Sequence, residues 1–323
     1  MTTEHIELLS TIVPVYNEEA SLPDFVAALM PVLIDLGLPF EVVFVNDGST
    51  DKSAQVLDDL ATTNANIRVV HFRRNFGQTA AMMAGLDYST GNVIIPIDAD
   101  LQNDPQDIPR LLEKLSEGYD LVSGWRKDRK DSKLSRNFPS WVANRLISKI
   151  SGVRLHDYGC TLKAYRRSII EDVRLYGEMH RFLPIYASWA GARTVELEVN
   201  HNARAQGESK YGLERVFKVP LDLIVVKFLS DYSQKPIYVF GGFGLFSHFL
   251  ALITFAVMVY FKFWGGKSFI ETPLPMVVVL FVLMGFISML LGLIAELVVR
   301  TYHESQNKST YIVRNTINID DKL

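Results

Sequence analysis

Two long apolar stretches constrain the fold of this chain more than any other feature of its sequence. Residues 236–261 and residues 272–295 carry no formally charged side chain. As helices they would be roughly 36–39 Å long, and the hydrocarbon core of a bilayer is about 30 Å thick. Core helices of a soluble protein are the alternative, but two helices apolar on every face need a larger surrounding domain than this chain can supply. The sequence therefore predicts two transmembrane helices within residues 236–296.

The connector between the two stretches is short, which predicts a hairpin whose ends lie on the same side of the membrane. Lys262 and Lys267 lie in the connector, whereas the basic residues outside it are Lys227, Lys235, Arg300, Lys308 and Arg314. The positive-inside rule thus favours cytoplasmic ends. The sequence begins without a signal-peptide pattern. We therefore expect a multi-pass protein of the cell (inner or plasma) membrane, with its N-terminal domain and both termini in the cytoplasm.

The first 211 residues alternate short apolar runs with helical patterns. The runs predict buried strands at residues 9–15, 41–45, 67–72, 93–97 and 121–123. Helical patterns lie at residues 18–36, 52–63, 78–89 and 106–117. This alternation predicts an α/β domain with a Rossmann-like, mostly parallel sheet and helices on both faces. The single cysteine, Cys160, excludes an intrachain disulfide, and the net charge of −3 gives no indication of a nucleic-acid partner.

Residues 212–235 join this domain to the apolar part and mix basic with apolar side chains. They predict an interfacial helix on the membrane surface, and a soluble amphipathic helix packed against the domain is the alternative. The predicted organisation is a cytoplasmic domain at residues 1–211, the interfacial helix at 212–235, two transmembrane helices within 236–296 and a cytoplasmic tail at 297–323.

Acidic and polar residues follow three of the predicted strands, at residues 14–19, 46–51 and 98–102. Ligands of such sheets bind at the carboxyl ends of the strands, so all three segments are expected on one edge. Each segment alone could be a turn or a helix cap. Three acidic strand ends on one edge are costly, however, unless a cation or hydrogen-bond donors compensate them.

Asp98, Asp100 and Gln102 predict a site for a divalent cation. Alternate residues of an extended segment point the same way, so these three side chains would share a face. Carboxylate and amide oxygens suit Mg²⁺ or Mn²⁺, and two carboxylates leave coordination positions for a diphosphate. The sequence has no Walker loop, no Gly-x-Gly-x-x-Gly and no zinc-type His/Cys spacing, which disfavours P-loop ATPases, dinucleotide enzymes and zinc enzymes.

Six short motifs follow one another along the chain: VPVYNE at 13–18, NDGS at 46–49, NFGQ at 75–78, DADLQ at 98–102, DYGC at 157–160 and GESKY at 207–211. With them the chain resembles the polyprenyl-phosphate glycosyltransferases of glycosyltransferase family 2, the group of dolichyl-phosphate mannose synthases and bacterial bactoprenol glucosyltransferases. The resemblance implies a catalytic domain of the GT-A fold, and the two-span C-terminal part matches the bacterial branch. Asn46 is a departure, because many relatives carry a second aspartate there.

The resemblance also implies a role for each matching position. The nucleoside of a nucleotide-sugar donor would be bound by Pro14, Tyr16, Glu18 and Asp47. Asp98 would lie near the donor ribose, diphosphate and metal, and the metal would be ligated by Asp100 and Gln102. The donor diphosphate would be neutralised by Arg204 and Lys210. The acceptor phosphate would be bound by Arg126 and Arg136, and Asp157 stands at the position of a candidate catalytic carboxylate.

The implied reaction is a displacement at the anomeric carbon by an oxygen of a lipid phosphate. A metal and basic side chains would stabilise the leaving diphosphate. A phosphate with a second pKa of about 6 is largely ionised at neutral pH, so a strong general base is less necessary. Asp157 would take the residual proton or orient the acceptor, and a structural turn at residues 157–159 is the alternative. The other basic residues of the stretch 124–154 would attract anionic lipid headgroups.

We therefore expect a membrane-bound, metal-dependent, inverting glycosyltransferase that moves one sugar onto undecaprenyl phosphate at the cytoplasmic face. Glucose from UDP-glucose is the first expectation, and transfer of 4-amino-arabinose or mannose by the same mechanism is the alternative. A processive polysaccharide synthase would carry a Gln-x-x-Arg-Trp motif and more spans than this sequence has. A non-enzymatic membrane scaffold would not need the acidic and basic motifs. The sequence leaves the oligomeric state open, including a homo-oligomer.

Overall fold

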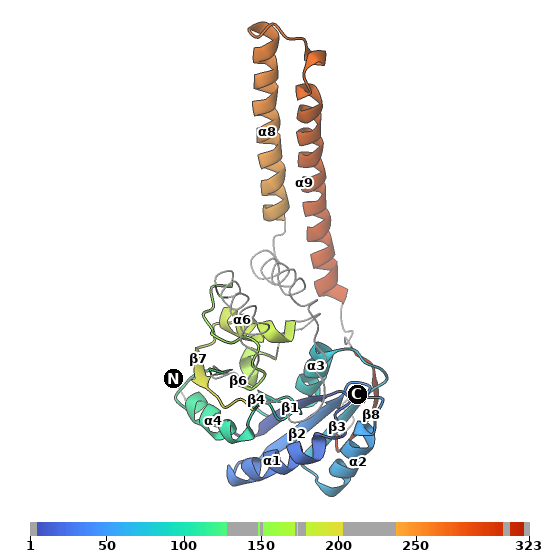
Figure 1. The fold of residues 1–323 in the computed structure, drawn as a ribbon, viewed down its shortest axis with the longest axis vertical. Helices are drawn as coiled ribbons and strands as arrows, with labels where there is room; N and C mark the ends of the chain where they lie inside the picture. Colours follow the sequence, from blue (N-terminus) through green and yellow to red (C-terminus); the bar gives the residue numbers. More distant parts are fainter. Residues whose placement is uncertain are drawn as a thin grey trace. The chain divides into compact units, whose positions relative to one another are not determined.

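The computed structural model describes residues 5–127, 148, 151–171, 173, 179–202, 237–305 and 311–319. The chain divides into two compact units: Met1–Leu223 with Ser309–Leu323, and Ile224–Lys308. The first unit is a sheet flanked by helices and the second contains two long helices (Figure 1). The interfacial helix predicted at residues 212–235 lies outside the described residues.

The first unit is built on an eight-stranded sheet. Its strands are β1 (Leu9–Val15), β2 (Phe40–Asn46), β3 (Ile67–Phe72), β4 (Val93–Pro96), β5 (Leu121–Trp125), β6 (Lys163–Arg166), β7 (Thr194–Glu198) and β8 (Val313–Ile317). They lie in the order β7-β5-β6-β4-β1-β2-β3-β8. Strands β1 to β4 pair in parallel, as do β5 and β7, whereas β6 and β8 run antiparallel to their neighbours. The predicted mostly parallel sheet is confirmed.

Helices cover both faces of this sheet. They are α1 (Leu22–Asp35), α2 (Ser53–Thr63), α3 (Gln78–Tyr88), α4 (Ile108–Ser116) and the shorter α6 (Leu183–Trp189). Helices α1 and α2 lie on one side of β1–β3 and α3 on the other (Figure 1). Apolar side chains of α1, α2 and α4 form one core cluster with the strands. Helix α3 approaches β1 so closely that a Cβ atom on Gly85 would lie 2.2 Å from Ile12 Cγ2.

The last strand, β8, comes from the far end of the chain. It pairs antiparallel with β3, with Val69 opposite Ile317 and His71 opposite Asn315. Asn318 has a left-handed backbone (φ 56°), and its side-chain amide donates to the carbonyl oxygens of Ala61 at 2.7 Å and Ile67 at 2.9 Å. The segment predicted as a tail at residues 297–323 therefore includes an edge strand of the first unit.

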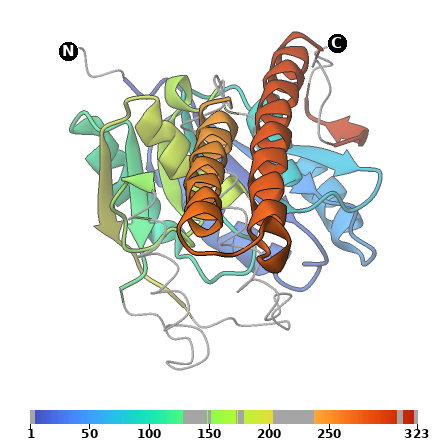
Figure 2. The ribbon, with the colours of Figure 1, turned by 90° about the horizontal axis from the view of Figure 1, so that it is seen from above.

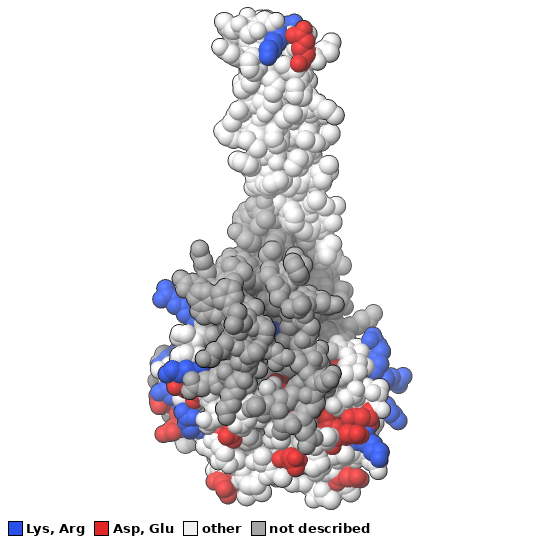
Figure 3. Space-filling view, viewed as in Figure 1, with Lys and Arg blue, Asp and Glu red and all other residues white. Residues whose placement is uncertain are grey.

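The second unit is an antiparallel pair of helices, α8 (Ile237–Phe263) and α9 (Leu274–Ser305). Figures 1 and 2 show the two helices side by side. The apolar parts long enough to cross a membrane are Phe240–Phe263 and Leu274–Ala295, and most of their side chains are exposed. In Figure 3 the described surface of the pair is free of charged side chains except near the connector. The segments predicted at residues 236–261 and 272–295 are thus confirmed as helices, and their insertion into a membrane stays a prediction.

Small residues set the contact between α8 and α9. A Cβ atom on Gly244 would lie 2.8 Å from Met289 Cγ and 2.9 Å from the carbonyl oxygen of Gly285. The Ser288 hydroxyl donates across the interface to the carbonyl oxygen of Phe240 at 2.8 Å. Helices in lipid associate through such close backbone packing and interhelical hydrogen bonds, because burial from water supplies no driving force there.

Gly244→Ala is expected to weaken the hairpin, and Gly242→Ala is its matched control on the same helix. Among the described residues, and apart from the adjoining backbone of its own helix, no atom lies within 4 Å of a Cβ atom built on Gly242. Both variants gain the same helix propensity, so their difference isolates the overpacking, which costs about 1–3 kcal/mol. Reversible unfolding in mixed detergent micelles measures the two free energies. Equal stability of the two variants would show that this contact does not hold the helices together.

Candidate active site

The loops after β1 and β2 are joined to each other by hydrogen bonds. The Asn17 backbone N–H donates to Ser49 Oγ at 3.0 Å, and Asn17 Oδ1 accepts from the Thr50 backbone N–H at 2.8 Å. The Glu18 N–H donates to Ser53 Oγ at 2.8 Å. Asn17 takes a left-handed backbone (φ 52°), which costs energy for a non-glycine residue and is typical of functional loops. The two loops therefore form one rigid surface.

Three of the predicted nucleoside-binding residues border this surface. Pro14 lies near the end of β1, and Tyr16 and Glu18 follow it in the loop. All three side chains are partly exposed, and Glu18 Oε2 accepts a hydrogen bond from Ser21 Oγ at 2.7 Å. The structure thus brings them to the carboxyl end of the parallel strands, and their contact with a nucleoside stays a prediction.

Asp47 lies beneath the next loop. One carboxylate oxygen accepts from the Phe76 backbone N–H at 2.6 Å and the other from the Gly77 N–H at 2.9 Å. Burial raises the pKa of Asp47, and these two N–H groups oppose that rise. Gly48 (φ +65°) allows the close approach, because a Cβ atom there would lie 2.3 Å from the backbone of Arg74. Asp47 therefore positions the loop at residues 75–77, and its predicted contact with a nucleoside stays a prediction.

Asn46 takes part in a buried hydrogen-bond chain. Its Oδ1 accepts from the Ser49 N–H at 3.0 Å, so its Nδ2 is the atom that faces His71 Nδ1 at 2.9 Å. Since Nδ2 can only donate, His71 Nδ1 accepts and Nε2 carries the proton, which it donates to Asp58 at 2.9 Å. Burial lowers the pKa of His71 despite the neighbouring Asp58. The Asn46 amide therefore donates to the unprotonated Nδ1 of a neutral His71 ring.

Asp98 lies at the centre of the carboxyl edge. One carboxylate oxygen accepts from Gln78 Nε2 at 3.0 Å and the other from Thr161 Oγ1 at 2.6 Å. Burial, followed by repulsion from Asp100, raises the pKa of Asp98 to about 6. Attraction to Arg126 and Lys163 only partly offsets this rise. Two neighbouring carboxylates in such surroundings favour a bound divalent cation.

The segment after Asp98 is a turn, so the extended geometry expected for residues 98–102 is wrong. Strand β4 ends at Pro96, and Leu101 adopts a left-handed backbone (φ 59°). Asp100 Oδ1 accepts from the Gln102 backbone N–H at 3.1 Å, which closes the turn. Beyond the end of the strand, the Asp100 side chain thus satisfies a backbone N–H that the sheet no longer pairs.

The residues that could ligate a cation here are Asp98, Asp100 and Gln102. Among the residues that the structure describes, no three His, Cys, Asp or Glu side chains converge on one point. A divalent ion at this turn would therefore complete its coordination shell with oxygens of the Gln102 amide, a diphosphate or water. This hard, oxygen-rich set suits Mg²⁺ or Mn²⁺, as expected from the sequence.

Arg126 and Asp157 form a buried, bidentate ion pair. Arg126 Nε and Asp157 Oδ2 are 2.7 Å apart, and Arg126 Nη2 and Asp157 Oδ1 are 3.0 Å apart. The side chains are 12% and 4% exposed, so water screens the pair only weakly. Asp157 Oδ1 also accepts from the Gly159 N–H at 3.0 Å, so the turn and the ion pair coexist. Within the described part of the chain, Arg126 Nη1 has no hydrogen-bond partner and can still donate to a phosphate.

Comparison with known proteins agrees with this geometry. The model of the family "Glycosyl transferase family 2" matches residues 10–174. The chain is also 42% identical over 310 residues to the dodecaprenyl-phosphate galacturonate synthase of Rhizobium johnstonii, a match that covers 95% of this chain and 92% of that protein.

The chain belongs to glycosyl transferase family 2.

This glycosyltransferase is also similar to a second relative in sequence and to a solved structure in fold. It is 37% identical over 314 residues to an undecaprenyl-phosphate 4-deoxy-4-formamido-L-arabinose transferase of Pseudomonas aeruginosa, covering 97% of this chain and 91% of that protein. It superposes with a TM-score of 0.54 and 19% identity on glucosyl-3-phosphoglycerate synthase from Mycobacterium tuberculosis in complex with Mn²⁺, UDP and phosphoglyceric acid, covering 69% of this chain and 78% of that one. The predicted GT-A fold of this glycosyltransferase is thereby confirmed.

Three of the predicted site residues, Arg136, Arg204 and Lys210, lie outside the described residues. The chain that leads to Arg204 is nevertheless described. Asn103 and His201 form an antiparallel bridge, and the Asn202 N–H donates to the carbonyl oxygen of Gln102 at 2.9 Å. The backbone two residues before Arg204 therefore lies against the turn that follows Asp98.

Sequence reasoning missed two residues that hold the loop around Asp157. Glu196 Oε1 accepts from the His156 N–H at 2.7 Å and from the Asp157 N–H at 3.4 Å. The buried Lys163 Nζ donates to the carbonyl oxygens of Tyr158 and Cys160. Glu196 lies on β7, whose alternating pattern TVELE is a strand signal that could have been recognised. Lys163 gave no such signal, because only tertiary contacts bury its ammonium group.

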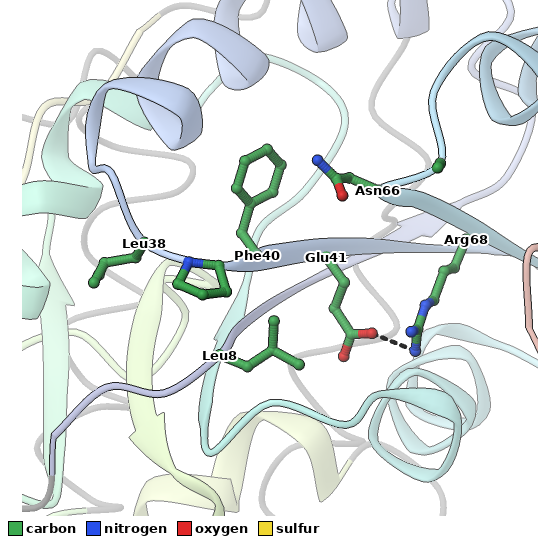
Figure 4. A pocket seen from close by; sticks show the side chains of 8 residues that line it. Leu8, Leu38, Phe40, Glu41, Asn66 and Arg68 are labelled. Atoms are coloured by element: carbon green, nitrogen blue, oxygen red, sulfur yellow. Dashed lines mark ion pairs between the residues drawn. The ribbon is translucent and has the colours of Figure 1, made fainter.

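A pocket lined by Leu8, Leu38, Pro39, Phe40, Glu41, Ala65, Asn66 and Arg68 lies at the opposite edge of the sheet (Figure 4). These residues lie at the amino ends of β1, β2 and β3. The Glu41 carboxylate is already engaged by Arg68, by the Ser10 hydroxyl and by the Thr90 N–H. Its charge is therefore compensated by the fold itself, and the carboxyl edge remains the candidate site.

Asn46→Asp is expected to raise the pKa of His71 above its ordinary value of 6.5. The new carboxylate would have to accept from Nδ1, so the ring would carry a proton on both nitrogens between two carboxylates. In the wild-type protein the lowered pKa of His71 favours the neutral ring. Stability therefore falls as the pH drops below the ordinary histidine pKa, because the unfolded chain then binds more protons than the folded one. NMR titration of ¹³C-labelled histidine measures both pKa values.

Asn92→Asp is the control for this titration, since it adds the same charge before β4, at the amino edge of the sheet. It should leave the pKa of His71 unchanged. An unchanged pKa in Asn46→Asp would contradict the assigned hydrogen-bond chain.

Proposed function

We propose that this glycosyltransferase transfers one sugar from a nucleotide-sugar onto a polyprenyl phosphate. The observation that carries the proposal is the buried Arg126–Asp157 pair, which lies close enough to Asp98 for the Arg126 charge to lower its pKa. A cation for an acceptor phosphate thus borders a carboxylate suited to a donor metal. The two apolar helices would anchor the enzyme in the bilayer that holds the polyprenyl chain of the acceptor. The names of both relatives, a dodecaprenyl- and an undecaprenyl-phosphate enzyme, support the same acceptor class.

In the proposed reaction each residue acts on a defined group. Arg126 donates from Nη1 to the acceptor phosphate while Nε and Nη2 stay bound to Asp157. This double contact fixes the plane of the guanidinium group and so the direction from which the phosphate oxygen attacks. Asp157 orients Arg126 and, through it, the acceptor phosphate. Asp98, Asp100 and Gln102 would hold Mg²⁺ or Mn²⁺, which supplies positive charge to the leaving diphosphate.

The order of strands supports the proposed topology. Strand β8 pairs with β3 inside the first unit, so the chain returns to the same domain after α9. Two spans between segments of one folded domain keep both segments on one side of a membrane. Because the basic residues that flank the hairpin outnumber those of its connector, we propose that this side is the cytoplasm.

The identity of the sugar is the finer part of the proposal. UDP-glucose is the donor expected from the bactoprenol glucosyltransferase branch. The names of the two relatives favour galacturonate and 4-deoxy-4-formamido-L-arabinose instead. The second of these fits the alternative of aminoarabinose transfer drawn from the sequence. All three sugars therefore belong in the first assay.

Purified full-length protein with Mn²⁺ and undecaprenyl phosphate is expected to turn over one of these UDP-sugars and to release UDP. A single displacement inverts the anomeric carbon, so an α-linked donor should give a β-linked product, which NMR coupling constants measure. Mass spectrometry should find one sugar per lipid. Products with several sugars would instead support a processive synthase. A product that keeps the anomeric configuration of its donor would contradict the single displacement, and absence of turnover with every donor would favour a scaffold.

Asp100→Ala is expected to lower turnover about a hundredfold or more while the protein stays folded, because the cation would lose a carboxylate ligand. Asp104→Ala is the matched control. Asp104 is not one of the proposed ligands: its carboxylate accepts from the Gln106 N–H at 3.0 Å and caps the short helix Pro105–Asp107. Initial rates over a Mn²⁺ titration measure the effect. Normal activity of Asp100→Ala would remove the metal assignment.

A further inference from the structure

We propose that the segment leading into the C-terminal strand β8 positions the donor-binding loop of the active site, and that Tyr311 is the positioning residue. This inference rests on the proposed function, in which a nucleotide-sugar binds at the carboxyl edge beside residues 75–77. It assigns a role in donor affinity to a segment that follows both apolar helices in the chain.

Tyr311 is anchored on the end of β3. Its side chain is buried, and its ring stacks on Phe72 with the centroids 5.0 Å apart and the planes 15° apart. Its hydroxyl donates to Asp87 Oδ2 of α3 at 2.8 Å. The neighbouring Arg73 N–H donates to the carbonyl oxygen of Ile312 at 3.1 Å. The segment before β8 is therefore fixed at the point where β3 passes into the loop.

The contact continues from Phe72 into the loop. The rings of Phe72 and Phe76 meet edge to face at 5.6 Å, and the Arg74 guanidinium lies 4.1 Å above the Phe76 ring. The Phe76 N–H donates to Asp47, and Gln78 at the start of α3 donates to Asp98. Ring contacts therefore connect Tyr311 to Phe72 and Phe76, and hydrogen bonds connect the segment at residues 76–78 to Asp47 and Asp98.

The loop needs this support because its own sequence orders it poorly. Arg73, Arg74 and Asn75 are exposed, and Gly77 has a positive φ of 95°. A glycine in such a loop keeps many conformations open. Packing Phe76 against Phe72, which in turn stacks on Tyr311, restricts these conformations before a ligand arrives. Such preorganisation raises affinity without any new ligand contact.

The experiment compares three variants of the full-length protein in lipid nanodiscs. Tyr311→Ala removes the stack, Tyr311→Phe keeps the stack and removes the hydroxyl, and Asn318→Ala frees the other end of β8 from Ala61 and Ile67. The Asn318 amide donates to carbonyl oxygens of Ala61, Asn64 and Ile67, at the end of α2 and the start of β3. Its loss therefore weakens the attachment of β8 without removing a described contact of the Phe76 loop.

Tyr311→Ala is expected to raise both the donor KM and the Kd of UDP with Mn²⁺ by about three- to tenfold, which matches the worth of an aromatic pair. The KM for undecaprenyl phosphate should stay unchanged. Tyr311→Phe should recover most of the donor affinity, and Asn318→Ala should leave it at the wild-type value. An equal rise for donor and acceptor, or the same rise in Asn318→Ala, would overturn the inference.

Hydrogen exchange separates failure of this inference from failure of the proposed function. The amides of Phe76 and Gly77 should exchange faster in Tyr311→Ala than in Asn318→Ala, whatever the protein binds. Unchanged exchange would overturn the positioning role even in an active enzyme. Exchange that is faster in Tyr311→Ala, together with a wild-type protein that neither turns over a donor nor binds UDP, would instead refute the proposed function. The contact between Tyr311 and the loop would then stand without a link to donor affinity.

Discussion

Negative charge gathered at the carboxyl edge of the parallel strands is the constraint on which the rest of this structure depends. Parallel strands end at one edge, so Asp47 and Asp98 lie there, and the loop before the antiparallel strand β6 brings Asp157 to Arg126 at the end of β5. All three carboxylates are largely removed from water. Two of them are compensated by the fold. Backbone N–H groups bind Asp47, and Arg126 binds Asp157 in a bidentate pair.

Asp98 is compensated least. Gln78 and Thr161 donate one hydrogen bond each to it, but neither carries charge, and Asp100 adds repulsion. The fold therefore leaves the negative charge of Asp98 and Asp100 only partly compensated by positive charge. A cation bound there would compensate this charge and would bring a donor diphosphate beside Arg126.

Much of the fold followed from local patterns. Strands β1 and β3 have the predicted bounds, because apolar runs buried on both faces of a parallel sheet carry a strong signal. The ends of α8 and α9 were found within a few residues, except that α9 continues beyond residue 295 to Ser305. Strands β6, β7 and β8 were not predicted. Strand β6 has only four residues, and β7 and β8 are the two edge strands and are partly polar, so none of them carries a strong local signal. Each pairs with the free backbone groups that a neighbouring strand offers.

The sequence by itself determined which residue types stand at the ends of the strands and which helices are too apolar for water. Period and composition are local properties, so they could be read along the chain. The tertiary structure alone decided that Asp157 pairs with Arg126, that residues 98–102 turn, and that Tyr311 stacks on Phe72. These contacts join residues far apart in the chain or depend on backbone angles, and no local pattern records them because the packing of the whole domain selects the partner.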